Sequence, residues 1–155
     1  MNVKVVCVGK LKEAYWRDAM AEYQKRLGRY CRLSVVEVAE SRNTSRTEGA
    51  VAAACREEGQ RILTQLSGTV VVLDLDGEEV SSERLAAIVR TAQDKGTDLT
   101  FVIGGSDGLS PEVLAAAHHT VRFGRITLPH QLCRVVLTEQ IYRAFCINAG
   151  VPYHK

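Results

Sequence analysis

Hydrophobic residues recur along the chain in two alternating patterns, short continuous runs and longer stretches with helical spacing. The short runs are rich in Val, Ile and Leu, which is typical of strands buried on both faces of a sheet. They predict strands at residues 2–8, 33–39, 70–75, 99–103, 120–123 and 126–128. The longer stretches predict helices at residues 11–27, 47–66, 82–95 and 131–149, with another helix opening at 110–112.

Residues that start or stop helices support this division. Thr47 and Ser110 are good N-caps, and Pro111 follows Ser110 at the first helical position. Gly28 and Gly96 stand where two helices are expected to end. Asp76-Gly77 is expected to be a turn that closes the strand at residues 70–75, and residues 41–46 are polar and loop-like.

Alternating strands and helices predict an α/β fold, with a mainly parallel sheet sandwiched by helices. The chain has 155 residues, of which 46% are hydrophobic, and a chain of this size can bury a real core. No repeat, low-complexity tract or linker divides it. We therefore expect a single domain over residues 1–155.

The last predicted helix is apolar around most of its circumference, with nine apolar residues between Leu132 and Ile147. Such a helix is usually buried on several sides. Packing on the sheet with one side and on a second copy of the chain with another would explain it. A central helix in a monomer is the alternative, and we favour the homodimer.

Composition and motifs exclude several classes of protein. No apolar run approaches the length of a membrane span, and no secretory signal precedes the first strand. The five cysteines are widely spaced, which argues against a disulfide framework. His130-x-x-Cys133 lacks a second pair of ligands, so we expect no metal site. These features predict a cytoplasmic protein with reduced thiols and no membrane partner.

Charge is distributed unevenly, although the net charge is only +2. Residues 1–32 carry eight Lys and Arg against three Asp and Glu, and residues 113–155 carry five against one. The middle of the chain is acidic. If the two ends of the chain meet in space, they form a basic face that suits RNA, although basic surfaces also occur in proteins without a nucleic-acid partner.

Ligands of open α/β sheets bind beyond the carboxyl ends of the strands. Three segments qualify here: the strand end at Leu73-Asp74, the loop at Gly104-Gly105, and residues 123–128. The glycine loop also matches the G-x-S-x-G form of a hydrolase, and a triad of Ser106, Glu139 and His154 is conceivable. The helix that follows starts late for a nucleophile elbow, and a tight glycine turn explains the same residues.

Polar residues near the end of the chain allow two interpretations. Glu139 and Arg143 lie four apart on a predicted helix and form either an ordinary surface pair or a charged pair beside a substrate. The segment Tyr153-His154-Lys155 is either a frayed terminus or a group that stacks on a base and contacts phosphate.

Taken together, the motifs resemble one family, the RlmH (YbeA) type of SPOUT-superfamily RNA methyltransferases. The resemblance covers essentially the whole chain, and its motifs occur in the family's order. They lie at residues 8–12, 22–27, 58–63, 101–109, 127–131, 134–137, 139–144 and 153–155.

The resemblance implies a homodimeric α/β domain with a C-terminal trefoil knot. It also implies transfer of a methyl group from S-adenosylmethionine to N3 of a pseudouridine in large-subunit (23S) ribosomal RNA, on the assembled ribosome. The cofactor site it implies comprises Leu73, Gly104, Gly105, Phe123, Gly124, Arg125, Ile126, Thr127 and Leu128. Arg143, Tyr153 and His154 would face the RNA, with Arg143, Glu139 and His154 as catalytic candidates and no metal.

Two other functions compete with this expectation. A serine hydrolase would use Ser106 and need no cofactor. A non-enzymatic ribosome-binding module would use the basic ends of the chain and would not bind S-adenosylmethionine.

Overall fold

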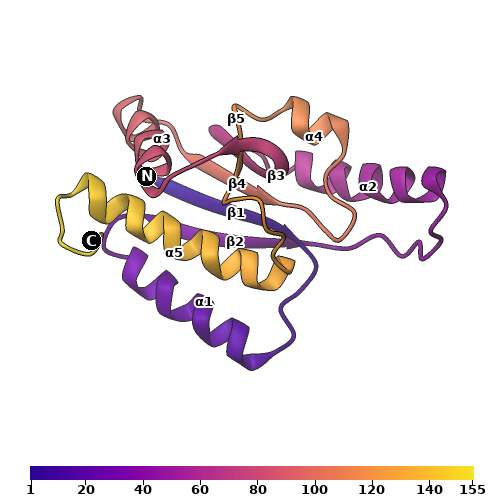
Figure 1. Cartoon of the computed structure of the whole chain (residues 1–155), viewed down its shortest axis with the longest axis horizontal. Helices are drawn as coiled ribbons and strands as arrows, with labels where there is room; N and C mark the ends of the chain where they lie inside the picture. Colours follow the sequence, from indigo (N-terminus) through magenta and orange to yellow (C-terminus); the bar gives the residue numbers. More distant parts are fainter.

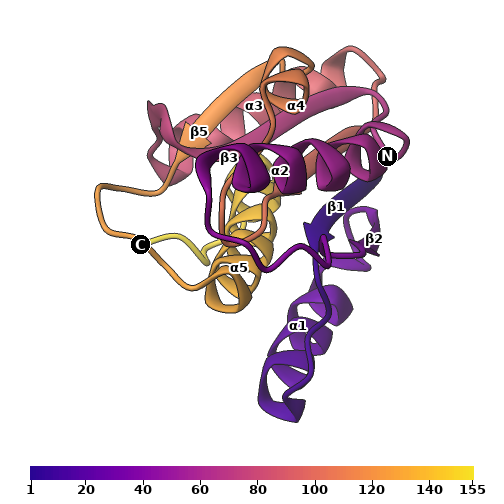
Figure 2. The same cartoon turned by 90° about the vertical axis from the view of Figure 1, so that its right-hand side faces the viewer.

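A sheet of five strands forms the centre of the computed structural model, which describes all 155 residues (Figures 1 and 2). The strands are β1 (Asn2–Val8), β2 (Arg32–Val38), β3 (Thr69–Glu79), β4 (Leu99–Ile103) and β5 (His119–Arg122). They lie in the order β2-β1-β4-β3-β5, and every pairing between them is parallel. The prediction of a mainly parallel sheet is therefore confirmed.

Helices cover both faces of the sheet (Figure 1). One face carries α1 (Ala14–Leu27), α3 (Ser82–Asp94) and α5 (His130–Asn148), and the other carries α2 (Glu48–Leu63) and α4 (Pro111–Ala115). Because side chains alternate along a strand, each strand contributes to both sides. On β1, Val5 packs in the larger core beneath α3 and α5, whereas Val6 packs beneath α2 and α4.

Local signals in the sequence place most helix starts. The side chains of Thr47 and Ser110 accept hydrogen bonds from backbone N–H groups three residues on, as expected of N-caps. The predicted helix start at residue 11 is wrong, since α1 begins at Ala14. The Leu11 N–H donates instead to the carboxylate of Glu37 (2.9 Å), which holds this segment out of the helix.

Two other local predictions are wrong. Asp76-Gly77 does not end the strand, because β3 continues to Glu79. Leu73 and Glu78 both pair with Val121 of β5, so residues 74–77 bulge out between them. Residues 126–128 form no strand and run irregularly from β5 to α5.

Candidate functional site

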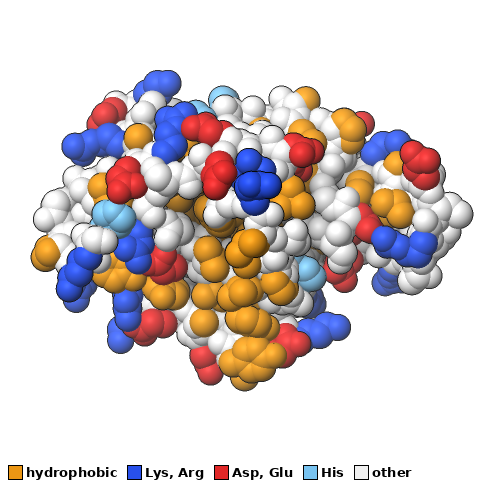
Figure 3. Space-filling model, in the orientation of Figure 1, with side chains coloured by type: hydrophobic (Ala, Val, Ile, Leu, Met, Phe, Trp, Pro, Cys, Tyr) orange, Lys and Arg blue, Asp and Glu red, His pale blue; other side chains and the backbone are white.

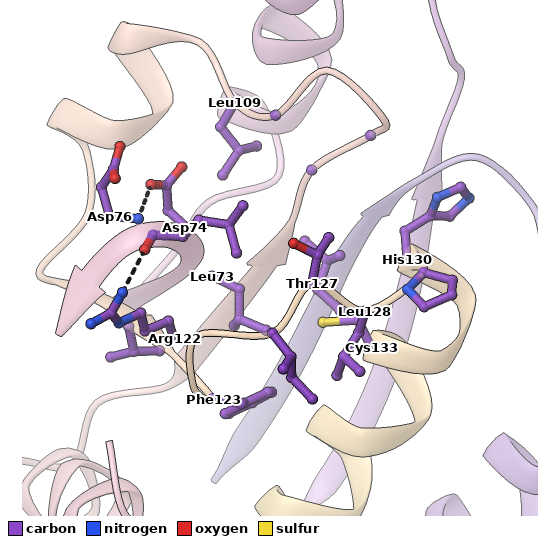
Figure 4. A pocket seen from close by; sticks show the side chains of 18 of the residues that line it. Leu73, Asp74, Asp76, Leu109, Arg122, Phe123, Thr127, Leu128, His130 and Cys133 are labelled. Atoms are coloured by element: carbon purple, nitrogen blue, oxygen red, sulfur yellow. Dashed lines mark hydrogen bonds between the residues drawn. The ribbon is translucent and has the colours of Figure 1, made fainter. Parts of the chain in front are cut away.

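A cavity of about 500 Å³ opens at the bulge of β3 and the carboxyl ends of β4 and β5 (Figure 4). The carboxyl ends of parallel strands meet at one edge of the sheet, and the loops that follow them form the walls. The lining comprises residues 73–76, 103–106, 108–109, 121–124, 126–130 and 133. All three strand-end segments singled out in the sequence therefore meet at one cavity.

Small residues keep the floor of this cavity open. A Cβ on Gly104 would lie 2.8 Å from the side chain of Leu109 and 3.0 Å from the carbonyl of Gly108. A Cβ on Gly105 would lie 3.1 Å from Oε1 of Glu58. Glycine therefore lets this loop fold tightly and exposes backbone groups to a ligand.

The segment between β5 and α5 forms the opposite wall. Phe123, Thr127 and Leu128 line the cavity, and Ile126 at its rim is 76% exposed. Of the nine residues expected at the cofactor site, eight line the cavity and Arg125 does not. The structure thus brings the expected residues together, apart from that one side chain.

Two carboxylates lie on the β3 bulge: Asp74 belongs to the strand-end segment singled out in the sequence, whereas Asp76 was missed. Asp74 and Asp76 both line the cavity, and the N–H of Asp76 donates to Oδ1 of Asp74 (2.9 Å; Figure 4). Arg122 holds the bulge by donating from Nη1 to the carbonyl of Leu75 (3.3 Å). Their position directly after a buried strand was the available signal. They give one wall of the cavity a negative charge.

The first turns of α5 complete the cavity with His130 and Cys133. The next residue, Arg134, points into the protein with only 2% of its side chain exposed. It donates to Oε2 of Glu37 (2.7 Å) and to the carbonyl of Gly9 (3.2 Å). This buried pair fixes the start of α5, and thereby the cavity wall, against the ends of β1 and β2.

A second polar cluster lies further along α5. Oε1 of Glu139 accepts hydrogen bonds from Nη2 (2.6 Å) and Nε (3.0 Å) of Arg143 and from the hydroxyl of Tyr153 (3.0 Å). The guanidinium of Arg143 lies 4.7 Å from the centre of the Tyr153 ring. The four residues expected to face RNA or take part in catalysis, Glu139, Arg143, Tyr153 and His154, are therefore in one network.

His154 is held from both sides. Nη1 of Arg143 lies 3.3 Å from Nδ1, and because arginine can only donate, Nδ1 is the acceptor. Nε2 then carries the proton of the neutral ring and donates to Oε1 of Glu83 on α3 (2.9 Å). No pattern in the sequence singled out Glu83.

Hydrogen bonding and burial shift pKa values in this network in the expected directions. The hydrogen bond to Glu139 raises the pKa of Arg143, so its guanidinium is a permanent cation. Burial, followed by the hydrogen bond to Glu139, raises the pKa of the Tyr153 hydroxyl, which therefore stays protonated and donates.

Within one chain, the cavity at the start of α5 is separated from the polar cluster further along the same helix. Arg143 lies ten residues beyond Cys133 on α5, which corresponds to roughly 15 Å along the helix axis. Ser106 lines the cavity but forms no hydrogen bond to Glu139 or His154, which belong to the distant cluster. The triad of a serine hydrolase is therefore not assembled.

Two further features of the structure bear on the kind of site. No group of three or more His, Cys, Asp or Glu side chains lies close enough to hold a metal ion. None of the helices combines the length and the apolar character that crossing a bilayer requires.

Comparison with known proteins gives consistent matches. A family model described as "Predicted SPOUT methyltransferase" matches residues 1–154. The chain is 50% identical to the ribosomal RNA large subunit methyltransferase H of Ligilactobacillus salivarius and 48% identical to that of Bifidobacterium animalis subsp. lactis. Each match covers the whole of this chain and the whole of the relative. A crystal structure of a putative methylase family protein from Neisseria gonorrhoeae shares the fold, with a TM-score of 0.56 and 15% identity over 91% of this chain and 81% of that one.

The family match spans nearly the whole chain, and the relatives match over their full length. The chain is a member of the SPOUT methyltransferase family.

Proposed function

We propose that this chain binds S-adenosylmethionine in the cavity at the bulge of β3 and the ends of β4 and β5, and methylates N3 of a pseudouridine in large-subunit (23S) ribosomal RNA. The observation that carries the proposal is the convergence of three separate segments on one cavity, in a chain about 50% identical to large-subunit rRNA methyltransferases. The preferred substrate would be the assembled ribosome, so the enzyme would act in the cytoplasm.

The residues of the cavity fit this cofactor. The glycine floor and the irregular wall at residues 123–128 offer backbone groups to a nucleoside, and Phe123, Ile126 and Leu128 offer apolar surface. Asp74 and Asp76 place negative charge on the opposite side, which complements a ligand carrying sulfonium and ammonium charges. When bound, S-adenosylmethionine supplies a methyl group that is already activated for transfer.

The polar cluster on α5 fits the part of the reaction that takes place on the RNA base. N3 of pseudouridine carries an imide proton, so the ring becomes anionic as that proton leaves. Arg143, whose guanidinium is permanently charged, would stabilise this anion. Three donors already converge on Oε1 of Glu139, so Glu139 fits the orientation of Arg143 better than proton abstraction.

His154 fits the role of base. Its Nδ1 accepts a hydrogen bond from Arg143 and becomes free when that guanidinium turns toward the substrate. The ring can then take the imide proton at Nδ1 while Glu83 holds Nε2. Tyr153, beneath Arg143, offers a ring for stacking on RNA.

A homodimer would bring the two halves together. Leu132, Val135 and Val136 are only half-buried on the outer face of α5, and Tyr15 on α1 is 65% exposed. Figure 3 shows hydrophobic side chains gathered over the first half of α5 and the start of α1. A second copy packed on this face about a two-fold axis, with the two α5 helices antiparallel, would place Arg143 of one chain beside the start of α5 in the other.

The same arrangement explains why each chain holds its cavity and its cluster at opposite ends of α5. Each active site would take the cavity from one chain and the cluster from its partner. The C-terminal trefoil knot, which family membership implies, stays a prediction.

The test is incubation of the purified protein with radiolabelled S-adenosylmethionine and ribosomes that lack the modification, with naked ribosomal RNA alongside. We expect label in the large-subunit RNA of the ribosomes. Absence of label in both samples, despite cofactor binding and a folded dimer, would refute the proposed substrate. A non-enzymatic ribosome-binding module would bind RNA but not the cofactor.

A further inference from the structure

The end of α1 and the end of α5 form a basic surface beside the polar cluster of Glu139, Arg143, Tyr153 and His154. No Asp or Glu occurs between residues 23 and 36 or after Glu139. Lys25, Arg26 and Arg29 lie in the first of these segments, and Arg143 and Lys155 in the second. We call these five residues the basic strip. Figure 3 shows Lys and Arg side chains gathered at the left of the molecule, where Figure 1 places the ends of α1 and α5.

Aromatic packing fixes the strip relative to the cluster. The ring of Tyr30, just beyond α1, stacks on Phe145 of α5 with a centroid distance of 5.8 Å. The guanidinium of Arg26 lies 5.9 Å from the centre of the Tyr142 ring, which meets the Tyr153 ring edge-on at 4.8 Å. The cations of α1 are thus held at a set distance from the proposed RNA-facing residues.

Some cations of the strip are free to bind a partner. Lys25, Arg29 and Lys155 are exposed and enter no ion pair, whereas Arg26 pairs with Glu22 and Arg143 with Glu139. Unpaired cations at fixed spacing suit a polyanion. The half-buried ring of Tyr153 beside them favours RNA over an acidic protein surface, because bases stack on such rings.

We propose that Lys25 and Arg29, at the end of α1, bind backbone phosphates of the substrate RNA next to the target nucleotide. This inference rests on the proposed function, which places Arg143, Tyr153 and His154 at that nucleotide. The two cations position the RNA and take no part in methyl transfer. They give a small domain a contact that reads the path of the RNA backbone rather than its sequence.

The test compares two double variants of the full-length protein. Lys25→Gln/Arg29→Gln removes the unpaired cations in the last turn of α1 and just beyond its end. Arg90→Gln/Lys95→Gln removes two exposed and unpaired cations from the far end of α3 and serves as the matched control. Binding to naked 23S ribosomal RNA is measured at several KCl concentrations, together with methyl transfer to ribosomes.

We expect the first variant to lower the salt dependence of binding. Each lost phosphate contact reduces the slope of log K against log salt by about 0.7 to 0.9, so two contacts reduce it by about 1.5. The KM for ribosomes should rise while kcat and cofactor affinity stay unchanged. The control variant should match the natural protein.

Three results would overturn the inference. Equal slopes for the natural protein and the Lys25/Arg29 variant would exclude phosphate contacts by these residues. An equal loss in the control variant would show a general charge effect. Weaker binding to ribosomes with unchanged binding to naked RNA would point to an acidic protein as the partner. Absence of methyl transfer by the natural protein would instead refute the proposed function.

Discussion

Arg134 of α5 and Glu37 of β2 form an ion pair at 2.7 Å in which one partner is buried and the other is not. Only 2% of the Arg134 side chain is exposed, compared with 34% for Glu37. Glu37 also accepts the N–H of Leu11, so the pair joins α5, β2 and the segment that precedes α1. The cavity wall at the start of α5 therefore depends on a contact made near the opposite edge of the sheet.

The unequal burial predicts unequal effects of removing each partner. Glu37→Ala leaves a buried guanidinium with only the carbonyl of Gly9, and we expect a loss of about 3 kcal/mol in the free energy of unfolding. Arg134→Met leaves a carboxylate that water can reach, and we expect a loss of about 1 kcal/mol. Urea unfolding followed by Trp16 fluorescence measures both. Equal losses would contradict the argument.

Arg143→Ala should slow methyl transfer far more than it weakens cofactor binding. Removal of one preorganised donor to a developing anion typically costs about a hundredfold in kcat. The dissociation constant of S-adenosylmethionine should stay within about twofold, because Arg143 is not among the residues that line the cavity. Single-turnover kinetics and calorimetry measure the two quantities. An equal loss of both would exclude the role proposed for Arg143, and Arg143→Lys should give an intermediate rate.

Glu83→Ala should release the end of the chain from α3. The carboxylate holds Nε2 of His154 at 2.9 Å and is itself 63% exposed, so the pair is worth about 1 kcal/mol or less. We expect kcat to fall by about fivefold. Nitrogen NMR of His154 should show the proton on Nε2 in the natural protein and a mixture of tautomers in the variant. Glu83→Gln retains an oxygen and the helix start, and so serves as the control. An unchanged tautomer in Glu83→Ala would contradict the prediction.

Gly77→Ala should disturb the bulge of β3. A Cβ at this position would lie 2.7 Å from backbone atoms of Thr120 and Val121, so β5 or the bulge has to move. We expect a loss of about 2 kcal/mol in the free energy of unfolding and weaker cofactor binding, because Asp74 and Asp76 move with the bulge. Gly49→Ala meets no atom within 4 Å and lies in helix α2, so it should be neutral or slightly stabilising. Similar behaviour of the two variants would contradict the steric argument.

Cysteine reactivity offers a test of the cavity without substitution. Burial raises the pKa of Cys133, which lines the cavity, and raises the pKa of Cys7 to about 12. At pH 8 we expect slow alkylation of Cys133 that S-adenosylmethionine slows further, and no alkylation of Cys7 in the folded protein. Cys31, whose pKa burial raises to about 11, lies outside the cavity lining and should not respond to the cofactor. Mass spectrometry of alkylated peptides measures all three, and equal protection of Cys31 and Cys133 would contradict the location of the site.

The sequence predicted the elements well where a single periodicity governs a segment. All residues of β1 and β4 were predicted as strands, because both strands are rich in Val, Ile, Leu and Phe and contain few polar residues. Asp76-Gly77 was misassigned because the dipeptide is a strong turn signal, while the pairing of Glu78 with Val121 is a long-range contact that no local pattern reveals. Tertiary structure prevailed over local propensity at this point.

The place of the cavity could be predicted because it follows from the parallel sheet, whereas contacts between side chains far apart in the sequence could not. The ends of parallel strands and the glycine loop identified the cavity, since ligands of such sheets bind there. Glu83 and Arg134 were missed because their partners, His154 and Glu37, are 71 and 97 residues away. Arg125 was expected with its neighbours, but its side chain lies outside the lining.

The central position of β4 has a consequence for how the molecule forms. β1 and β3 do not pair with each other, and only β4, near residue 100, joins them into one sheet. The chain before β4 can make the β1–β2 pair but cannot close either core, so most of its stabilising contacts wait for a late segment. Such non-local assembly is slow and exposes strand edges in the meantime. A fragment that ends before β4 should therefore fail to fold, and the nascent chain should depend on protection against aggregation until β4 has emerged.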